Sequence, residues 1–253
     1  MNYSLTDIPD SGKNPVVNME ICINGEFFGM VRIKLFREVF PAGVENFVKI
    51  SAGKTYQITK KGANRVSYTK DTRRSYDGCA FYHFSHNNYI VSGDIYNNDG
   101  TKAGTIYNDM PIPAILGDFY YPHESKGLVS LIPYHDEASG NLFYDSTFMI
   151  TLDNVRPTNV LKDLDADQIV IGQISEGIDL LDRINCMIKP FAGRRYPKIS
   201  IGRTEVYRTT LNTIWRIRPT PRIQRKFINQ PINTIIVPDD TIIVPNDTVI
   251  ENI

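Results

Sequence analysis

Two runs of alternating apolar residues, separated by an Asn–Gly pair, constrain the fold more than any other feature of this chain. Apolar residues stand at every second position from Val17 to Ile23, which is the period of a β-strand with one buried face. Asn24–Gly25 follows, and such a pair favours a two-residue hairpin turn because both residues tolerate a positive φ angle. A second alternating run covers residues 29–36. The pattern therefore predicts an antiparallel β-hairpin.

Most of the chain that follows consists of short apolar runs separated by Gly, Pro, Asn and Asp, and only two segments have helical periodicity. One helix is predicted over residues 40–53, with Pro41 in its first turn. A second is predicted over residues 175–188, with Ser175 as its cap. The predicted strands are 81–84, 89–91, 127–132, 147–152, 168–173 and 199–206. Many short strands with two helices favour a mainly β domain, either a barrel or a sandwich.

The composition excludes several classes of protein. The 253 residues include 28 Lys and Arg and 28 Asp and Glu, and a nucleic-acid partner is not expected because such proteins usually carry a basic excess. No run reaches the roughly 20 apolar residues that span a bilayer, and residues 1–15 lack the apolar core of a secretory signal. Three widely spaced cysteines, Cys22, Cys79 and Cys186, indicate reduced thiols in a cytosol-like compartment.

The chain is predicted to consist of an N-terminal tail at residues 1–15, a β-rich domain at 16–208 and a C-terminal extension at 209–253. Within the domain, residues 54–77 are polar and charged and longer than an ordinary connection, so a surface insertion is predicted there. The extension carries a seven-residue near-repeat of Thr-Ile-Ile-Val-Pro followed by Asp or Asn. Its two full apolar triplets are Ile235, Ile236 and Val237, and Ile242, Ile243 and Val244.

This repeat predicts short strands, since β-branched triplets end at Pro-Asp or Pro-Asn turns and a proline in every seven residues excludes a continuous helix. Three short strands cannot bury a core of their own. We therefore expect an oligomerisation arm that exchanges between the subunits of a homo-oligomer. Packing of the extension on its own barrel is the alternative.

A series of sequence blocks then points to a family. They are the run Gly29–Gly53 with Glu45-Asn46-Phe47, Tyr76-x-Gly78-x-x-Phe81, Ser92-Gly93-Asp94, Gly104–Tyr107, Lys126–Ser130, Ser146–Ile150, Leu164-Asp165, Ile169–Gly172 and Glu176-Gly177. In this order, over about residues 17–207, the chain resembles the cyclophilins. The resemblance implies a mainly β fold, an eight-stranded antiparallel barrel closed by two α-helices, here with a C-terminal extension of short strands. It also implies a peptidyl-prolyl cis–trans isomerase that uses no cofactor and no metal.

The resemblance places the peptide groove of the family on residues of a different chemistry. In a cyclophilin, an Arg favours the twisted prolyl amide, against a barrier of roughly 18–20 kcal/mol, and a Gln orients that Arg. Here the Arg becomes His83 and the Gln becomes Val91. The other positions of this degenerate peptide groove are Tyr89, Ile132, Pro133, Thr147, Met149, Leu164 and Gln168. Among them only Leu164 keeps the residue type of the family.

These replacements all weaken the groups that bind and isomerise a prolyl peptide in the family. A histidine is mostly uncharged near pH 7 and lacks the bidentate fork of arginine, while Pro133 offers no backbone N–H to a peptide. We expect a module that binds proteins or proline-containing peptides, or has a structural role, with no useful isomerase activity and weak or no cyclosporin binding. The alternative is a residual isomerase in which His83 or Tyr89 is a weaker donor. His83 and His86 are three residues apart and are not expected to bind a metal.

Overall fold

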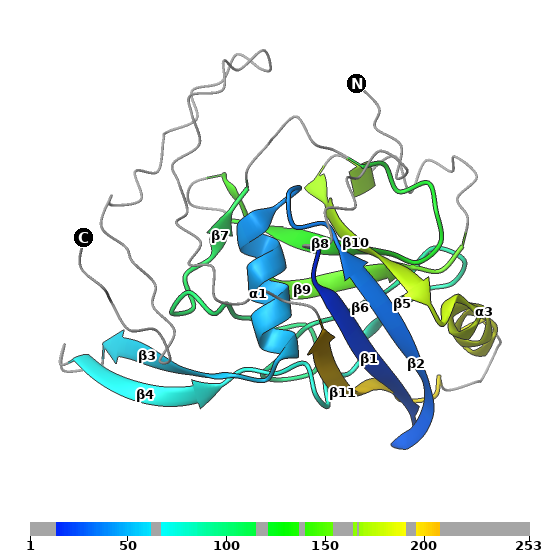
Figure 1. Cartoon of the computed structure of the whole chain (residues 1–253), viewed down its shortest axis with the longest axis horizontal. Helices are drawn as coiled ribbons and strands as arrows, with labels where there is room; N and C mark the ends of the chain where they lie inside the picture. Colours follow the sequence, from blue (N-terminus) through cyan, green and yellow to red (C-terminus); the bar gives the residue numbers. More distant parts are fainter. Residues whose placement is uncertain are drawn as a thin grey trace, which may run out of the picture. The chain divides into compact units, whose positions relative to one another are not determined.

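The computed structural model describes residues 14–61, 67–114, 121–136, 140–153, 164–165, 167–190 and 196–207. The described part is mainly β with two α-helices, as predicted (Figure 1). The predicted N-terminal tail up to residue 13 and the predicted oligomerisation arm, with both of its Ile/Val triplets, lie outside the described residues.

The N-terminal hairpin has the form that its sequence predicts. Strand β1 (Val16–Ile23) pairs antiparallel with β2 (Glu26–Leu35). The turn residues Asn24 and Gly25 have φ angles of 53° and 88°, the left-handed conformation in which asparagine and glycine are favoured. The structure thus confirms the hairpin that the alternating pattern predicted.

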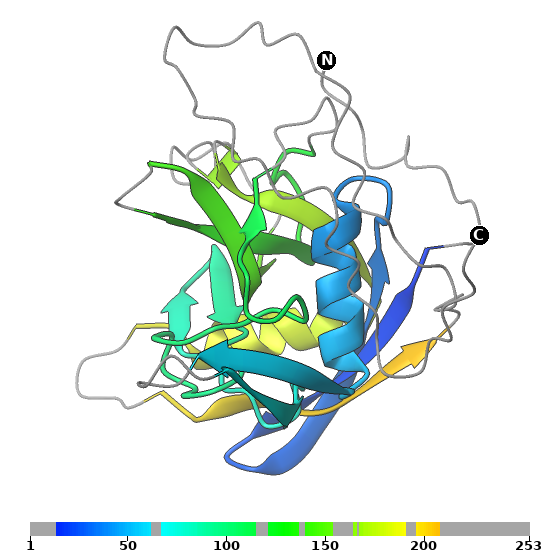
Figure 2. The same ribbon diagram turned by 90° about the vertical axis from the view of Figure 1, so that its left-hand side faces the viewer.

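The strands form one large antiparallel sheet in the order β11-β1-β2-β10-β8-β9-β6-β5. In Figure 2 these strands curve around the core. The other strands of this path are β5 (His83–Ser85), β6 (Tyr89–Ser92), β8 (Leu128–His135), β9 (Leu142–Thr151), β10 (Ile169–Glu176) and β11 (Ile199–Tyr207). The short strand β7 (Ile112–Pro113), which the sequence did not predict, pairs with β9 outside this path.

Backbone hydrogen bonds bring the two ends of the sheet together. The N–H of Phe81, just before β5, donates to the carbonyl of Ile199 over 2.9 Å, and the N–H of Ile201 donates to the carbonyl of Cys79 over 2.8 Å. The first and last strands of the path are therefore neighbours, which fits the barrel that the cyclophilin resemblance implied.

The two helices pack apolar side chains against the curved sheet. Helix α1 (Pro41–Ser51) begins at a proline and buries Phe47, whose ring contacts Phe148 edge-on at a centroid distance of 5.2 Å. Helix α3 (Ile178–Met187) buries Leu181 and Ile184. Both helices were predicted, and their bounds differ from the prediction by at most three residues at either end.

The predicted cap of the second helix is wrong. Ser175 belongs to β10, and its hydroxyl donates to the carbonyl of Arg32. The helix instead begins after Gly177, which has a φ of 84°. A Cβ at Gly177 would lie 2.3 Å from the carbonyl oxygen of Met30, so only glycine fits between β10 and α3. The sequence contained this signal, since glycine favours a positive φ.

Residues 54–77 are more ordered than the predicted surface insertion. They include an antiparallel hairpin of β3 (Thr55–Lys61) and β4 (Ser67–Arg73), which forms a separate two-stranded sheet and projects from the barrel in Figure 1. The segment after this hairpin returns to the core, since Arg74 and Tyr76 are almost fully buried. The prediction of a surface insertion is therefore correct for the hairpin of β3 and β4 and wrong for the segment that follows it.

Candidate functional site

One row of the sheet ladder carries the positions that the resemblance assigned to catalysis. His83 on β5 lies opposite Val91 on β6, Val91 lies opposite Met149 on β9, and Met149 lies opposite Ser130 on β8. Directly paired residues in antiparallel strands point to the same face of a sheet. His83, Val91 and Met149, the residues that the resemblance predicts at the positions of the family's Arg, its orienting Gln and one pocket Phe, are therefore neighbours in this fold.

Val91, Met149 and Leu164 form one buried apolar cluster at this row. Their exposed fractions are 5%, 0% and 8%. Tyr89 and Ile132, two further predicted positions, pack against the cluster while remaining partly exposed. Five of the nine predicted groove residues thus meet in one cluster, in which the three central side chains leave almost no apolar surface for a proline ring to cover.

His83 lies at the edge of this cluster and is exposed. Its ring stacks on Tyr89, with the ring centroids 5.8 Å apart and the planes inclined by 29°. A stacked imidazole places its ring nitrogens beside the tyrosine face, and its side chain is shorter than an arginine. It therefore cannot place the forked pair of N–H donors that an arginine brings to a peptide carbonyl.

Tyr82 is a site residue that the sequence did not predict. It packs against the buried cluster, and its hydroxyl is hydrogen-bonded to the Thr147 side chain. Burial raises the pKa of Tyr82 to about 12, and the nearby Asp145 carboxylate acts in the same direction, whereas the bond to Thr147 acts against them. The Tyr82 hydroxyl is therefore uncharged at pH 7.

Asp145 brings a carboxylate to this side of the cluster. Its Oδ1 accepts the backbone N–H of Thr147 over 2.7 Å. Burial raises the pKa of Asp145, and the hydrogen bonds from Thr147 oppose that effect. The surroundings of the cluster thus include the Asp145 carboxylate and the hydroxyl groups of Tyr82 and Thr147.

Pro133 and Gln168, like His83 and Thr147, are predicted residues that lie outside the cluster. Pro133 lies opposite Tyr144, after a break in the β8–β9 register, and a bulge is a common place for a residue without an N–H in a sheet. The backbone N–H of Gln168 donates to the carbonyl of Leu164. The side-chain oxygen Oε1 of Gln168 is buried, and among the described residues it has no hydrogen-bond partner.

Helix α3 holds the turn that carries two of the site residues. The backbone N–H of Asn87 donates to Oδ1 of Asn185, and the Asn185 amide donates to Oδ1 of Asn87, both over 2.8 Å. Asn87 has a φ of 64°, which asparagine tolerates. This turn joins β5 to β6, so one pair of asparagines ties α3 to the segment between His83 and Tyr89.

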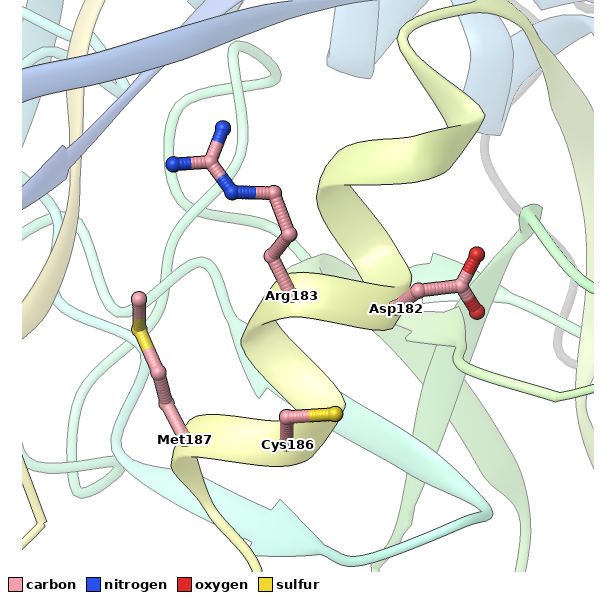
Figure 3. Close-up of a pocket in the computed structure, with 4 residues that line it drawn as sticks. All are labelled: Asp182, Arg183, Cys186 and Met187. Carbon is pink, nitrogen blue, oxygen red and sulfur yellow. The ribbon is translucent and has the colours of Figure 1, made fainter.

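An open hollow of about 400 Å³ lies on α3, away from the buried cluster, and is lined by Asp182, Arg183, Cys186 and Met187. Figure 3 shows Arg183 and Met187 extending on one side of the helix, with Asp182 and Cys186 on the other. The Arg183 guanidinium lies 3.9 Å from the centre of the Phe28 ring, and Lys126 pairs with Asp182. These charges are already used in the fold, and we assign no chemistry to the hollow.

Among the described residues, no three His, Cys, Asp or Glu side chains gather as a metal site. No helix within those residues is long and apolar enough to cross a membrane.

Comparison with known proteins decides the family. The model for the cyclophilin type peptidyl-prolyl cis-trans isomerase/CLD family matches residues 18–206. The chain belongs to the cyclophilin family. A structural PPIase-like protein of Acanthamoeba polyphaga mimivirus is 56% identical over 232 residues, which are 91% of this chain and 98% of that relative. The crystal structure of the mimivirus cyclophilin is 57% identical, has a TM-score of 0.66, and covers 83% of this chain and 98% of that one.

This cyclophilin also contains site residues that spacing along the chain could not connect. His123 contacts both Ser130 and Asp165, and Asp165 directly follows Leu164 of the cluster. Ser130 and Asp165 stood in two of the family blocks, but 35 residues separate them and nothing in the sequence placed His123 between them. The sequence feature that could have identified Tyr82 as a site residue is its position directly before His83.

Proposed function

We propose that this cyclophilin has no useful prolyl-isomerase activity and works as a protein-binding or structural module. The observation that carries the proposal is the ladder row in which His83 lies opposite Val91, the two residues that the resemblance predicts in place of the family's Arg and Gln. Without a permanent cation next to the prolyl amide, the twisted amide gains no charge-assisted hydrogen bond. In a reaction without a covalent step, such a hydrogen bond is the main contribution that the site makes to the rate.

Two more observations support the same proposal. The buried cluster of Val91, Met149 and Leu164 offers little surface to a proline ring. Pro133 has no N–H to hold the backbone of a bound peptide. The same losses lead us to propose weak or no cyclosporin binding, and calorimetry that detected tight, saturable binding of cyclosporin would contradict this.

The test is NMR exchange spectroscopy on a capped Ala-Ala-Pro-Phe peptide with substoichiometric full-length protein. We expect cis–trans exchange at the uncatalysed rate, because the amide barrier of roughly 18–20 kcal/mol is not lowered. Exchange that rises in proportion to the protein concentration would overturn the proposal. Line broadening without faster exchange would support a peptide-binding role instead of an enzymatic one.

The second candidate is a residual isomerase with a weaker donor. The exposed position of His83 on the Tyr89 ring favours it, since both side chains carry a polar group. The variants His83→Ala and Tyr89→Phe distinguish a residual isomerase from the non-catalytic module. If wild-type protein accelerates exchange and either variant does not, the donor is identified and the second candidate replaces the first.

A structural role in a viral particle is part of the proposal. Its support is that one relative is called a structural PPIase-like protein of Acanthamoeba polyphaga mimivirus. We further propose a homo-oligomer assembled through residues 209–253, whose apolar Ile/Val triplets need a covering partner. Quantitative mass spectrometry of purified particles tests the first point, and absence of this chain from the particles contradicts it.

A further inference from the structure

The hairpin of β3 and β4 is a sheet of its own, apart from the barrel. Its strands pair with each other from Thr55 opposite Arg73 to Lys61 opposite Ser67, and no third strand of the described residues pairs with either of them. No other helix or strand within those residues packs closely along the hairpin, and Figure 1 shows it projecting from the barrel. Each of its strands therefore keeps one edge to which no other described strand is paired.

The base of this hairpin is anchored, whereas its length depends on two strands alone. Tyr56 is almost fully buried, and the backbone N–H of Arg74 donates to the carbonyl of Lys54 over 3.1 Å. A two-stranded sheet is marginally stable in water without a third strand or a packed helix. Both strands contain Thr and Tyr, which favour the β conformation. The edge of such a sheet is suited to accept a further strand.

The hairpin also concentrates positive charge in a chain that is neutral overall. Residues 54–73 contain six Lys and Arg and one Asp, so the rest of the chain has 22 basic and 27 acidic residues. The formal charge is therefore +5 for the hairpin segment and −5 for the remainder. A patch of one sign attracts partners of the opposite sign, so the hairpin is complementary to an acidic partner.

The two strands differ in the charges that they contribute. β3 has Lys60 and Lys61 and no carboxylate, whereas β4 has Asp71 directly after Lys70. The guanidinium of Arg73, the other basic residue of β4, already pairs with the Asp77 carboxylate over 3.2 Å. Consecutive residues of a strand belong to opposite faces of the sheet, so β3 has one lysine position on each face. The edge of β3 is therefore the better place for an acidic strand.

Three kinds of partner could use a basic edge of this kind. A second copy of β3 offers no carboxylate to Lys60 and Lys61, and edge lysines are a common protection against such self-pairing. A long nucleic acid would also come close to the remainder of the chain, whose net charge of −5 repels a polyanion. A short acidic segment of a protein contacts the hairpin alone, and it can pair its backbone with the edge.

We propose that the edge of β3 is a docking site for an extended acidic segment of another protein, which adds to the hairpin as a third strand. In this mode of recognition the backbone hydrogen bonds supply affinity and the side chains supply specificity. Acidic residues of the partner lie opposite Lys60 and Lys61. The site is separate from the peptide groove and goes beyond the proposed function, because it operates whether or not the groove isomerises prolines.

The first test is an NMR titration of ¹⁵N-labelled full-length protein with a capped Thr-Val-Glu-Glu-Val-Thr-Val peptide, whose adjacent glutamates match the adjacent lysines. We expect saturable binding and slower hydrogen exchange at every second amide of β3, because the N–H groups of a strand alternate between its two edges. Binding that protects no alternate amides of β3 would overturn the addition of a strand. Binding should also weaken several-fold when the salt concentration is raised from 50 to 500 mM.

The second test changes the two lysines. The double variant Lys60→Gln with Lys61→Gln should bind the peptide about fivefold more weakly than wild type, and Lys60→Glu with Lys61→Glu about thirtyfold more weakly, since cross-strand pairs of opposite charge are lost and then become repulsive. The matched control is Lys189→Gln with Lys198→Gln, which removes the same charge from two exposed lysines outside the hairpin. The control should bind like wild type.

Three results would overturn the inference. They are the absence of saturable binding in wild type, equal binding of a peptide with Lys in place of both Glu, and an equal loss of affinity in the control variant. A ten-nucleotide oligothymidylate that binds the hairpin more tightly than the peptide would make the partner a nucleic acid and overturn the protein segment. None of these results involves cis–trans exchange, so a failure here is distinguishable from a failure of the proposed function.

Discussion

Asn87 and Asn185 lie 98 residues apart in the chain and exchange two hydrogen bonds of 2.8 Å. One is in the turn between β5 and β6, and the other is on α3. His83 precedes this turn and Tyr89 follows it, so the stacked pair at the edge of the site is held in place from a helix that contributes no residue to the apolar cluster.

Loss of this link should loosen the site more than it destabilises the protein. For Asn185→Ala we expect the free energy of unfolding to fall by only about 1 kcal/mol, since both bonds are exposed to solvent. Amide exchange in residues 83–89 should accelerate several-fold. Hydrogen-exchange mass spectrometry measures this, with Cys186→Ala, the next and exposed residue of α3, as the control. Equal exchange in the two variants would show that the turn is held by other contacts.

Arg74 carries a buried charge, and the stability of the fold should be sensitive to the loss of its partner. Its guanidinium is fully buried, donates to the Tyr96 hydroxyl, and lies 2.7 Å from Asp109. Removing one partner of a buried pair costs about 3–5 kcal/mol, and we expect Asp109→Ala to lower the free energy of unfolding by about 3 kcal/mol in urea denaturation. The double variant Arg74→Met with Asp109→Ala should recover part of this. A loss below about 1 kcal/mol in the single variant contradicts the prediction.

The thiol of Cys79 should resist alkylation. Burial raises the pKa of Cys79 to about 12, and the Asp94 and Asp77 carboxylates add to the effect. At pH 8 we expect iodoacetamide to modify the exposed Cys186 and to spare Cys79 until the protein is unfolded, as read by peptide mass spectrometry. Rapid modification of Cys79 in the folded protein would show that the barrel opens locally.

The same raised pKa has a consequence at alkaline pH. The thiol ionises near pH 9 in the unfolded chain and near pH 12 in the folded protein. The folded state therefore binds more protons between these values, and the free energy of unfolding falls as pH rises through this window. We expect Cys79→Ala to flatten the fall of the unfolding free energy over this range. Cys186→Ala, which changes an exposed thiol, should leave the profile as it is.

The C-terminal extension should control assembly. Its Ile/Val triplets are apolar and interrupted by proline, so in the proposed arrangement they are covered by another subunit. Light scattering should give a defined homo-oligomer for the full-length protein and a single subunit for a truncation after Arg208. One subunit per particle in both would leave packing of the extension on its own barrel as the explanation.

The hairpin at Asn24–Gly25 and the two helices could be predicted because turn residues and apolar periodicity act within a few residues. The start of α3 was placed too early, since Ser175 has the chemistry of a cap, yet the carbonyl of Met30 leaves room only for Gly177 at the true boundary. The sequence blocks predict that His83 stands in place of the family's Arg. The stacking of His83 on Tyr89 could not be predicted, because it depends on how β5 and β6 meet.

The sequence by itself therefore determined the cyclophilin fold, and it predicts the loss of the permanent cation, since residue type and local order carry both. Only the tertiary structure decided that Met149 is fully buried with Val91 and Leu164, and that His123 joins Ser130 to Asp165. The physical reason is that burial and side-chain hydrogen bonds depend on contacts between residues far apart in the chain. Those contacts exist only once β8, β9 and the turn before β10 have come together.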